Sequence, residues 1–287
     1  MFLANVAHRA TTFVGGQPVD VQKESGGRFP ADPALLYDCW DEFRAWADGL
    51  GASGPGRVAD DELEAPSPRP AQVFGMSLNY RDHAVEAGVD LPEFPSAFTK
   101  FPSCIVGPNT PVELAGPTTD WEIELVVVMG RLTRKVRPEQ AWEHVAGLTV
   151  GQDLSERTRQ LQGPLPQFSL GKSFPGYGPT GPWLVTSDEL PDRDDIPLRC
   201  TLDGETVQDS RTSELIFSVP ELIAQLSDVV ALLPGDLIFT GTAAGVGFAR
   251  SPKRFLTAGQ ELVSEIDGIG RLCTRLVQTS QPAGLLA

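Results

Sequence analysis

Hydrophobic residues follow a helical spacing near the N-terminus of the chain. A helix is predicted to begin at Pro33, with Asp32 as its N-cap, and to end near Gly49. Its apolar face would consist of residues three or four positions apart: Leu36, Cys39, Trp40, Phe43 and Trp46. An aromatic stripe of this kind is typical of core packing, so we assign it no cofactor.

Short apolar runs separated by Gly and Pro dominate the chain after residue 70. They predict many short strands and only two helices, at residues 139–145 and 218–227, the second with a capping box formed by Ser218 and Glu221. Residues 51–70 are rich in Gly, Pro and acids without periodicity, which indicates a linker. We therefore predict a mixed, β-rich α+β fold, with a small N-terminal α/β domain (1–65) and a β-sandwich or roll (70–280).

One predicted strand, between Trp121 and Gly130, carries two acids in an otherwise apolar run. Because side chains alternate along a strand, Glu122 and Glu124 share one face, opposite Ile123. Burying either carboxylate without a partner would cost roughly several kcal/mol, and a divalent cation bound between them would offset this cost. The commoner fate of such a pair is an exposed face with two solvated acids.

Composition limits the partners. The formal charge of −15 argues against nucleic acid and anionic membranes. No apolar run approaches the ~20 residues that span a bilayer, and the first 16 residues lack the pattern of a signal peptide. The four cysteines are far apart, with no C-x-x-C pair, which indicates reduced thiols in a cytoplasmic protein: Cys39, Cys104, Cys200 and Cys273.

A candidate general base lies at residues 78–86. His83 and Glu86 are three positions apart, which places them on one face of a helix. A carboxylate beside an imidazole orients the ring and raises its basicity. Taken alone, the pair is better explained by a surface helix with a salt-bridged histidine, although the chain offers only two other histidines, His8 and His144.

Two further segments carry charged residues that could belong to the same site, an aspartate and a lysine. Asp153 follows an apolar stretch, where a capping role is the local expectation, but it could add a third carboxylate to Glu122 and Glu124. Three oxygen ligands suit Mg²⁺ or Mn²⁺ and do not suit zinc. Lys172 lies in Gly-Lys-Ser, where the first glycine of a P-loop would fall at Pro166, so we expect no P-loop. It either reaches the surface or supplies positive charge near a bound anion.

A Gly-rich loop follows the strand after Pro234-Gly235-Asp236. It contains Gly241, Thr242, Gly245 and Gly247, without the helical pattern that a dinucleotide fingerprint requires. Its backbone amides and Thr242 could cradle a carboxylate, and an ordinary turn between strands is the alternative.

In this order, the motifs resemble the fumarylacetoacetate hydrolase family over roughly residues 70–277. The matching segments are Asn79-Tyr80-x-x-His83-Ala84, Asp120-Trp121-Glu122-Ile123-Glu124-Leu125, Gln152-Asp153-x-Ser155, Lys172-Ser173-Phe174, Pro234-Gly235-Asp236 and Gly241-Thr242-x-x-Gly245-Val246-Gly247. Two departures are Ala243 where the family usually has Pro, and Asp203 where it usually has Asn. The run 155–157 and residues 181–186 resemble the branch that acts on 2,4-dioxo sugar acids.

The resemblance implies a β-roll, usually a homodimer, with Mg²⁺ or Mn²⁺ in a cleft. It implies roles for these residues: Glu122, Glu124 and Asp153 as metal ligands, His83 and Glu86 as the water-activating pair, Lys172 as active-site lysine, and Gly241, Thr242, Arg157 and Gln160 as substrate contacts. We therefore predict a hydrolase that cleaves a carbon–carbon bond in a 2,4-dioxo acid, with a small oxo acid as its substrate. The alternatives are an oxo-acid decarboxylase or tautomerase on the same scaffold, and a non-catalytic metal- or ligand-binding protein.

Overall fold

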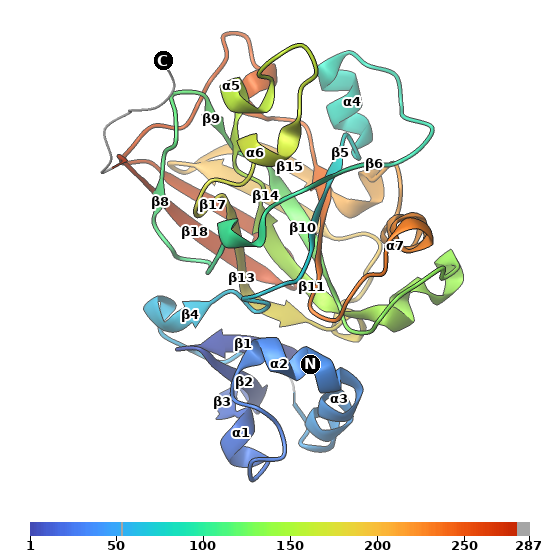
Figure 1. The fold of residues 1–287 in the computed structure, drawn as a ribbon. Helices are drawn as coiled ribbons and strands as arrows, with labels where there is room; N and C mark the ends of the chain where they lie inside the picture. The colour runs from blue at the N-terminus through green and yellow to red at the C-terminus, as the bar shows by residue number, and fades with distance from the viewer. Residues whose placement is uncertain (53, 280–287) are drawn as a thin grey trace.

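The computed structural model describes residues 1–52 and 54–279, which form a small N-terminal unit and a larger unit that follows it (Figure 1). The described part of the N-terminal unit contains three strands and three α-helices: β1 (Phe2–Val6), β2 (Arg9–Val14), β3 (Gln17–Asp20), α1 (Val21–Glu24), α2 (Pro33–Leu36) and α3 (Trp40–Gly49). Strand β1 pairs antiparallel with β13 of the larger unit, so one sheet runs through both.

That sheet has eleven strands, in the order β3-β2-β1-β13-β11-β10-β16-β5-β6, with β4 on β1 and β7 on β13. Its members outside the N-terminal unit are β4 (Leu63–Glu64), β5 (Val73–Ser77), β6 (Ser96–Thr99), β7 (Ile105–Val106), β10 (Ile123–Met129), β11 (Val145–Gln152), β13 (Gly178–Val185) and β16 (Leu237–Thr242). Strand β4 lies within the predicted linker, which therefore contributes to the sheet.

A five-stranded sheet packs against the first, in the order β15-β14-β17-β18-β8. It consists of β8 (Val112–Glu113), β14 (Pro197–Leu202), β15 (Glu205–Arg211), β17 (Glu261–Ile266) and β18 (Gly270–Val277). The remaining strands of the larger unit are the pair β9 (Thr119–Asp120) and β12 (Ser155–Glu156), and its α-helices are α4 (Arg81–Ala87), α5 (Arg157–Gln160), α6 (Phe168–Gly171) and α7 (Val219–Val229). The predicted β-rich α+β fold is confirmed.

Strand β10 is buried along its whole length because both of its faces are covered. Leu125 and Val127 belong to the core between the two sheets, together with residues of β14 and β18. Val126 and Val128 belong to a second core, which includes Phe43 of α3. The N-terminal unit thus buries the outer face of the strand that begins at the two acids, and this apolar packing fixes the strand in place.

The helix predictions have different outcomes. Asp32 caps α2 by accepting a hydrogen bond from the Ala34 amide at 3.0 Å, but a 3₁₀ turn separates α2 from α3. The capping box of Ser218 and Glu221 starts α7 as predicted. The helix predicted at residues 139–145 is present at Pro138–His144, but it is a 3₁₀ helix and not an α-helix. Among the described residues, none of the helices is long and apolar enough to cross a membrane.

Candidate metal centre

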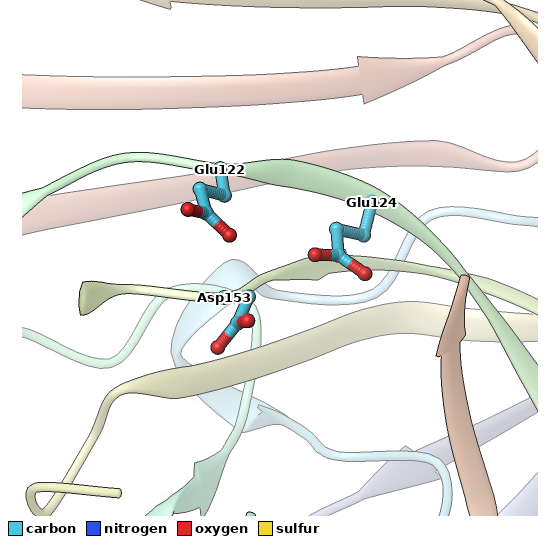
Figure 2. A group of neighbouring side chains, drawn as sticks. All are labelled: Glu122, Glu124 and Asp153. Atoms are coloured by element: carbon cyan, nitrogen blue, oxygen red, sulfur yellow. The ribbon is translucent and has the colours of Figure 1, made fainter. Parts of the chain in front are cut away.

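Three carboxylates meet at one end of the neighbouring strands β10 and β11 (Figure 2). Glu122 precedes β10, Glu124 lies within it, and Asp153 follows β11. The antiparallel pairing of Ile123 with Gln152 places Asp153 beside Glu122, whose carbonyl accepts the Asp153 amide at 2.9 Å. One oxygen from each carboxylate lies within 4.8 Å of the others. The alternative of two solvated acids fails, because Glu122 and Glu124 are only 7% and 1% exposed.

The donor set fits a hard divalent cation, since it consists of carboxylate oxygens alone. Burial and the charges of Asp153 and Glu122 raise the pKa of Glu124 well above its usual range. No Lys or Arg among the described residues forms a salt bridge with Glu124, which accepts a hydrogen bond from the Gly241 amide at 2.7 Å. Glu124 therefore favours a proton when no cation is near, and a cation would take the place of that proton.

Lys172 holds the other two carboxylates. Its ammonium lies 2.7 Å from Glu122, 2.6 Å from Asp153 and 2.8 Å from the hydroxyl of Ser155. Burial would raise the pKa of Glu122, but Lys172 and Arg157 together lower it to about 2. The predicted active-site lysine thus lies against the candidate metal ligands and is only 2% exposed, so it does not reach the surface.

A second lysine, Lys100, completes the charge balance and was not singled out from the sequence. Its ammonium lies 2.6 Å from Asp153 and 3.1 Å from the carbonyl of Tyr177, and it also donates to the carbonyl of Lys172. Lys100 is 1% exposed. The sequence feature that could have drawn attention to Lys100 is its position directly after the uncharged strand Ser96–Thr99. The partners of Lys100, however, lie more than 50 residues away in the sequence.

Lys100→Met is expected to lower the free energy of unfolding by about 3 kcal/mol. A buried pair that loses one partner typically costs ~3–5 kcal/mol, and Lys172 still neutralises Asp153 in the variant. Urea unfolding in EDTA measures the change, with the exposed Lys23→Met as the matched control. A loss no larger than that of Lys23→Met would show that Lys100 contributes no structural charge.

His83 and Glu86 meet on α4 as the sequence predicts. Nδ1 of His83 lies 2.9 Å from Oε2 of Glu86, and the Gly245 amide donates to Oε1 of Glu86 at 2.8 Å. Because the carboxylate accepts a hydrogen bond from the Nδ1–H group, Nε2 is the ring nitrogen that remains available. His83 lines a cavity of about 220 Å³ together with Glu122, Lys172 and Thr242.

Arg157 and Gln160, from α5, line the same cavity. The guanidinium of Arg157 donates two hydrogen bonds to Asp120, from Nε at 2.9 Å and from Nη2 at 2.7 Å. Its Nη2 also lies 2.7 Å from Glu122, and its Nη1 donates to Gln160 at 2.9 Å. Asp120, which is fully buried, also accepts the amides of Gly247 and Phe248. The sequence motif alone gives Asp120 no role, whereas in the fold its carboxylate connects Arg157 with the Gly-rich loop.

The Gly-rich loop does bind carboxylates through its amides, but these carboxylates belong to the chain itself. Gly241 donates to Glu124, Gly245 to Glu86, and Gly247 to Asp120. The Thr242 hydroxyl donates to the Ile123 carbonyl at 2.9 Å and accepts from Gln208 at 2.9 Å. Gly245 has φ +107, and a Cβ there would lie 2.1 Å from the carbonyl oxygen of Val207, so the turn requires glycine. The loop thus orients the chain's own acids.

The family model for the fumarylacetoacetate (FAA) hydrolase C-terminal region matches residues 72–277. The chain belongs to the fumarylacetoacetate hydrolase family. This confirms the resemblance seen in the sequence motifs and places the chain in a family of enzymes. All the residues that form the carboxylate cluster and the base pair fall within the matched region.

Individual members of the fumarylacetoacetate hydrolase family carry different activities in their names. Oxaloacetate tautomerase fahd2, mitochondrial, from Xenopus laevis is 40% identical over 217 residues, which cover 75% of this chain and 68% of that protein. The crystal structure of a proposed HpcE protein from Mycobacterium smegmatis has a TM-score of 0.92 and 53% identity, covering 98% of this chain and 100% of that one. A maleylpyruvate hydrolase from Sphingobium sp. SYK-6, in complex with manganese(II) and pyruvate, has a TM-score of 0.79 and 26% identity, with coverage of 98% and 100%.

Proposed function

We propose that the chain is a divalent-metal-dependent hydrolase that cleaves a carbon–carbon bond in a 2,4-dioxo acid. The observation that carries the proposal is the position of His83, which is paired with Glu86 and lines the same cavity as Glu122 and Lys172. A protein that only bound a metal or ligand would need no oriented base there. The manganese(II) and pyruvate in the Sphingobium hydrolase support a divalent cation and a 2-oxo acid as the partners.

The ligands of the cation would be Glu122, Glu124 and Asp153. When bound, Mg²⁺ or Mn²⁺ would supply Lewis-acid polarisation of the 2-oxo group and offset the negative charge that develops during cleavage. Lys172 would add positive charge, and because its three protons already point to Glu122, Asp153 and Ser155, its effect on the substrate is electrostatic.

The proton transfer is assigned to His83. Glu86 holds the proton on Nδ1, so Nε2 takes a proton from the water that attacks the distal carbonyl. The carbon–carbon bond then breaks, the electron pair stays on the 2-oxo acid fragment as an enolate, and His83 returns the proton to its carbon. The products are pyruvate, for an acylpyruvate substrate, and a second carboxylic acid. Arg157 and Gln160 would contact the substrate from α5, and Gly241 and Thr242 would border it from the loop.

An oxaloacetate tautomerase is the second candidate, and the 40% identical Xenopus protein is the observation that favours it. The same Nε2 would then move a proton between carbon and oxygen of the oxo acid without the attack of water. A homodimer and a cytoplasmic location stay predictions.

A panel assay tests the proposal. Acylpyruvates, 2,4-dioxo sugar acids and oxaloacetate are incubated with Mg²⁺ or Mn²⁺, and products are identified by mass. We expect pyruvate or a related 2-oxo acid together with a second acid from at least one 2,4-dioxo compound. Enol–keto exchange of oxaloacetate with no cleavage of any 2,4-dioxo compound would favour the tautomerase.

A further inference from the structure

The cationic side chains at the cavity have almost no free hydrogen-bond donors. An ammonium has three N–H donors, and those of Lys172 are taken by Glu122, Asp153 and Ser155. Those of Lys100 are taken by Asp153 and by two backbone carbonyls. Within the described residues, neither lysine can donate to a further carboxylate without giving up a partner.

Arg157 is nearly as fully used. Of the five N–H donors of its guanidinium, two point to Asp120, one to Glu122 and one to Gln160, which leaves one. Three amides of the Gly-rich loop, those of Gly241, Gly245 and Gly247, are bonded to carboxylates of the chain, as described above. Lys253 forms no salt bridge among the described residues, but it lies 3.5 Å from the centre of the Phe248 ring and does not line the cavity.

The cavity wall also has an apolar part, beside the polar Ser77, His83, Gln160 and Thr242. Its apolar members come from β5 and the turn after it, from β6, from α6, from the end of α5 and from the loop after β16: Met76, Leu78, Phe98, Phe168, Leu161 and Phe248. Phe98 and Phe168 pack edge to face at 5.9 Å, and Lys172 lies 5.1 Å from the centre of the Phe98 ring. The apolar wall therefore begins directly beside the charged cluster.

From these two observations we infer that the cavity selects monoanionic 2,4-dioxo acids with a short apolar acyl group. This inference rests on the proposed function. The metal carboxylates and the single free Arg157 donor serve the 2-oxo acid end, and the aromatic and aliphatic wall takes the acyl group. A second carboxylate on that group would meet apolar side chains, while the nearby Lys172 has no donor left to pair with it, and burying such a charge unpaired is costly. Hydroxyl groups of a sugar acid would also lose hydrogen bonds there.

The test measures binding, so that it does not depend on turnover. Three oxamates share the group that mimics a 2-oxo acid and differ only in the tail: N-propyloxamate, N-(2-carboxyethyl)oxamate and N-(2,3-dihydroxypropyl)oxamate. Their affinities for the Mn²⁺-loaded protein are determined by competition with oxalate in a calorimeter. We expect the propyl compound to bind at least about tenfold more tightly than the carboxyethyl compound. Tighter binding of the carboxyethyl or dihydroxypropyl compound overturns the inference.

A variant pair reports on the wall itself. Leu161 lines the cavity and is 41% exposed, so it lies at the rim, where a longer side chain has room. Leu161→Arg should improve the affinity for N-(2-carboxyethyl)oxamate by about tenfold, and the neutral control Leu161→Gln should not. Equal affinities in the two variants would contradict the placement of the acyl group. If none of the three oxamates displaces oxalate, the proposed function itself fails. That result differs from a preference for the carboxyethyl or dihydroxypropyl tail, which overturns only the inference about the acyl group.

Discussion

Replacing Glu124 with glutamine is expected to abolish both divalent-ion binding and activity while the fold stays intact. The amide keeps the shape of the side chain and an oxygen for the Gly241 amide, but it removes one of three negative charges that lie within 4.8 Å of each other. Burial and the charges of Asp153 and Glu122 raise the pKa of Glu124, so the metal-free protein disfavours a negative charge at this position and a neutral amide suits it. The substitution should therefore remove cation binding and the activity that depends on it, and leave the stability of the metal-free fold unchanged.

Calorimetric titration with Mn²⁺ measures the loss of ion binding, and the thermal midpoint of unfolding in EDTA measures whether the fold stays intact. The matched control is Glu265→Gln, which changes an exposed glutamate on β17. Wild-type activity of Glu124→Gln in excess EDTA would show that the three carboxylates do not hold a catalytic cation.

Removing the imidazole of His83 should be the second large effect. His83→Ala is expected to lower kcat by roughly 10²- to 10⁴-fold, the usual contribution of a positioned general base. Oxalate affinity of the Mn²⁺-loaded protein should stay close to the wild-type value, since the three carboxylates and Arg157 are unchanged. Stopped-flow assay of product formation and calorimetry with oxalate report the two quantities separately.

His144→Ala is the control for His83→Ala, because His144 bonds to Thr133 and does not line the cavity. Normal turnover of His83→Ala would mean that another group activates water. Equal losses of turnover and oxalate affinity would instead indicate that His83 only shapes the site.

The sequence pattern was enough to predict those parts of the site that depend on the residue spacing within a single strand or helix. Alternation along a strand placed Glu122 and Glu124 on one face, and helical spacing paired His83 with Glu86, as the structure shows. The role of Asp153 came from the family resemblance, because its local position is equally typical of a cap. Its place beside Glu122 depends on the pairing of β10 with β11.

The parts that could not be predicted are contacts between distant segments. Lys100 meets Asp153 across 53 positions and Asp120 meets Phe248 across 128, and neither spacing has a local signature. The acceptors of the Gly-rich loop amides were missed for the same reason. The short helix before β11 differs for a local reason, since periodicity does not distinguish an α-helix from a 3₁₀ helix over two turns.

The most direct test of the proposed function follows oxygen from water into product. The Mg²⁺-loaded enzyme is given acetylpyruvate in ¹⁸O-labelled water, and the products are analysed by mass within one turnover, for the wild type and for His83→Ala. We predict that acetate forms with one ¹⁸O in its new carboxylate, together with pyruvate, and that both appear at least about 100-fold more slowly with His83→Ala. Unlabelled, uncleaved acetylpyruvate, together with rapid His83-dependent enol–keto exchange of oxaloacetate, would contradict the hydrolase and establish the tautomerase in its place.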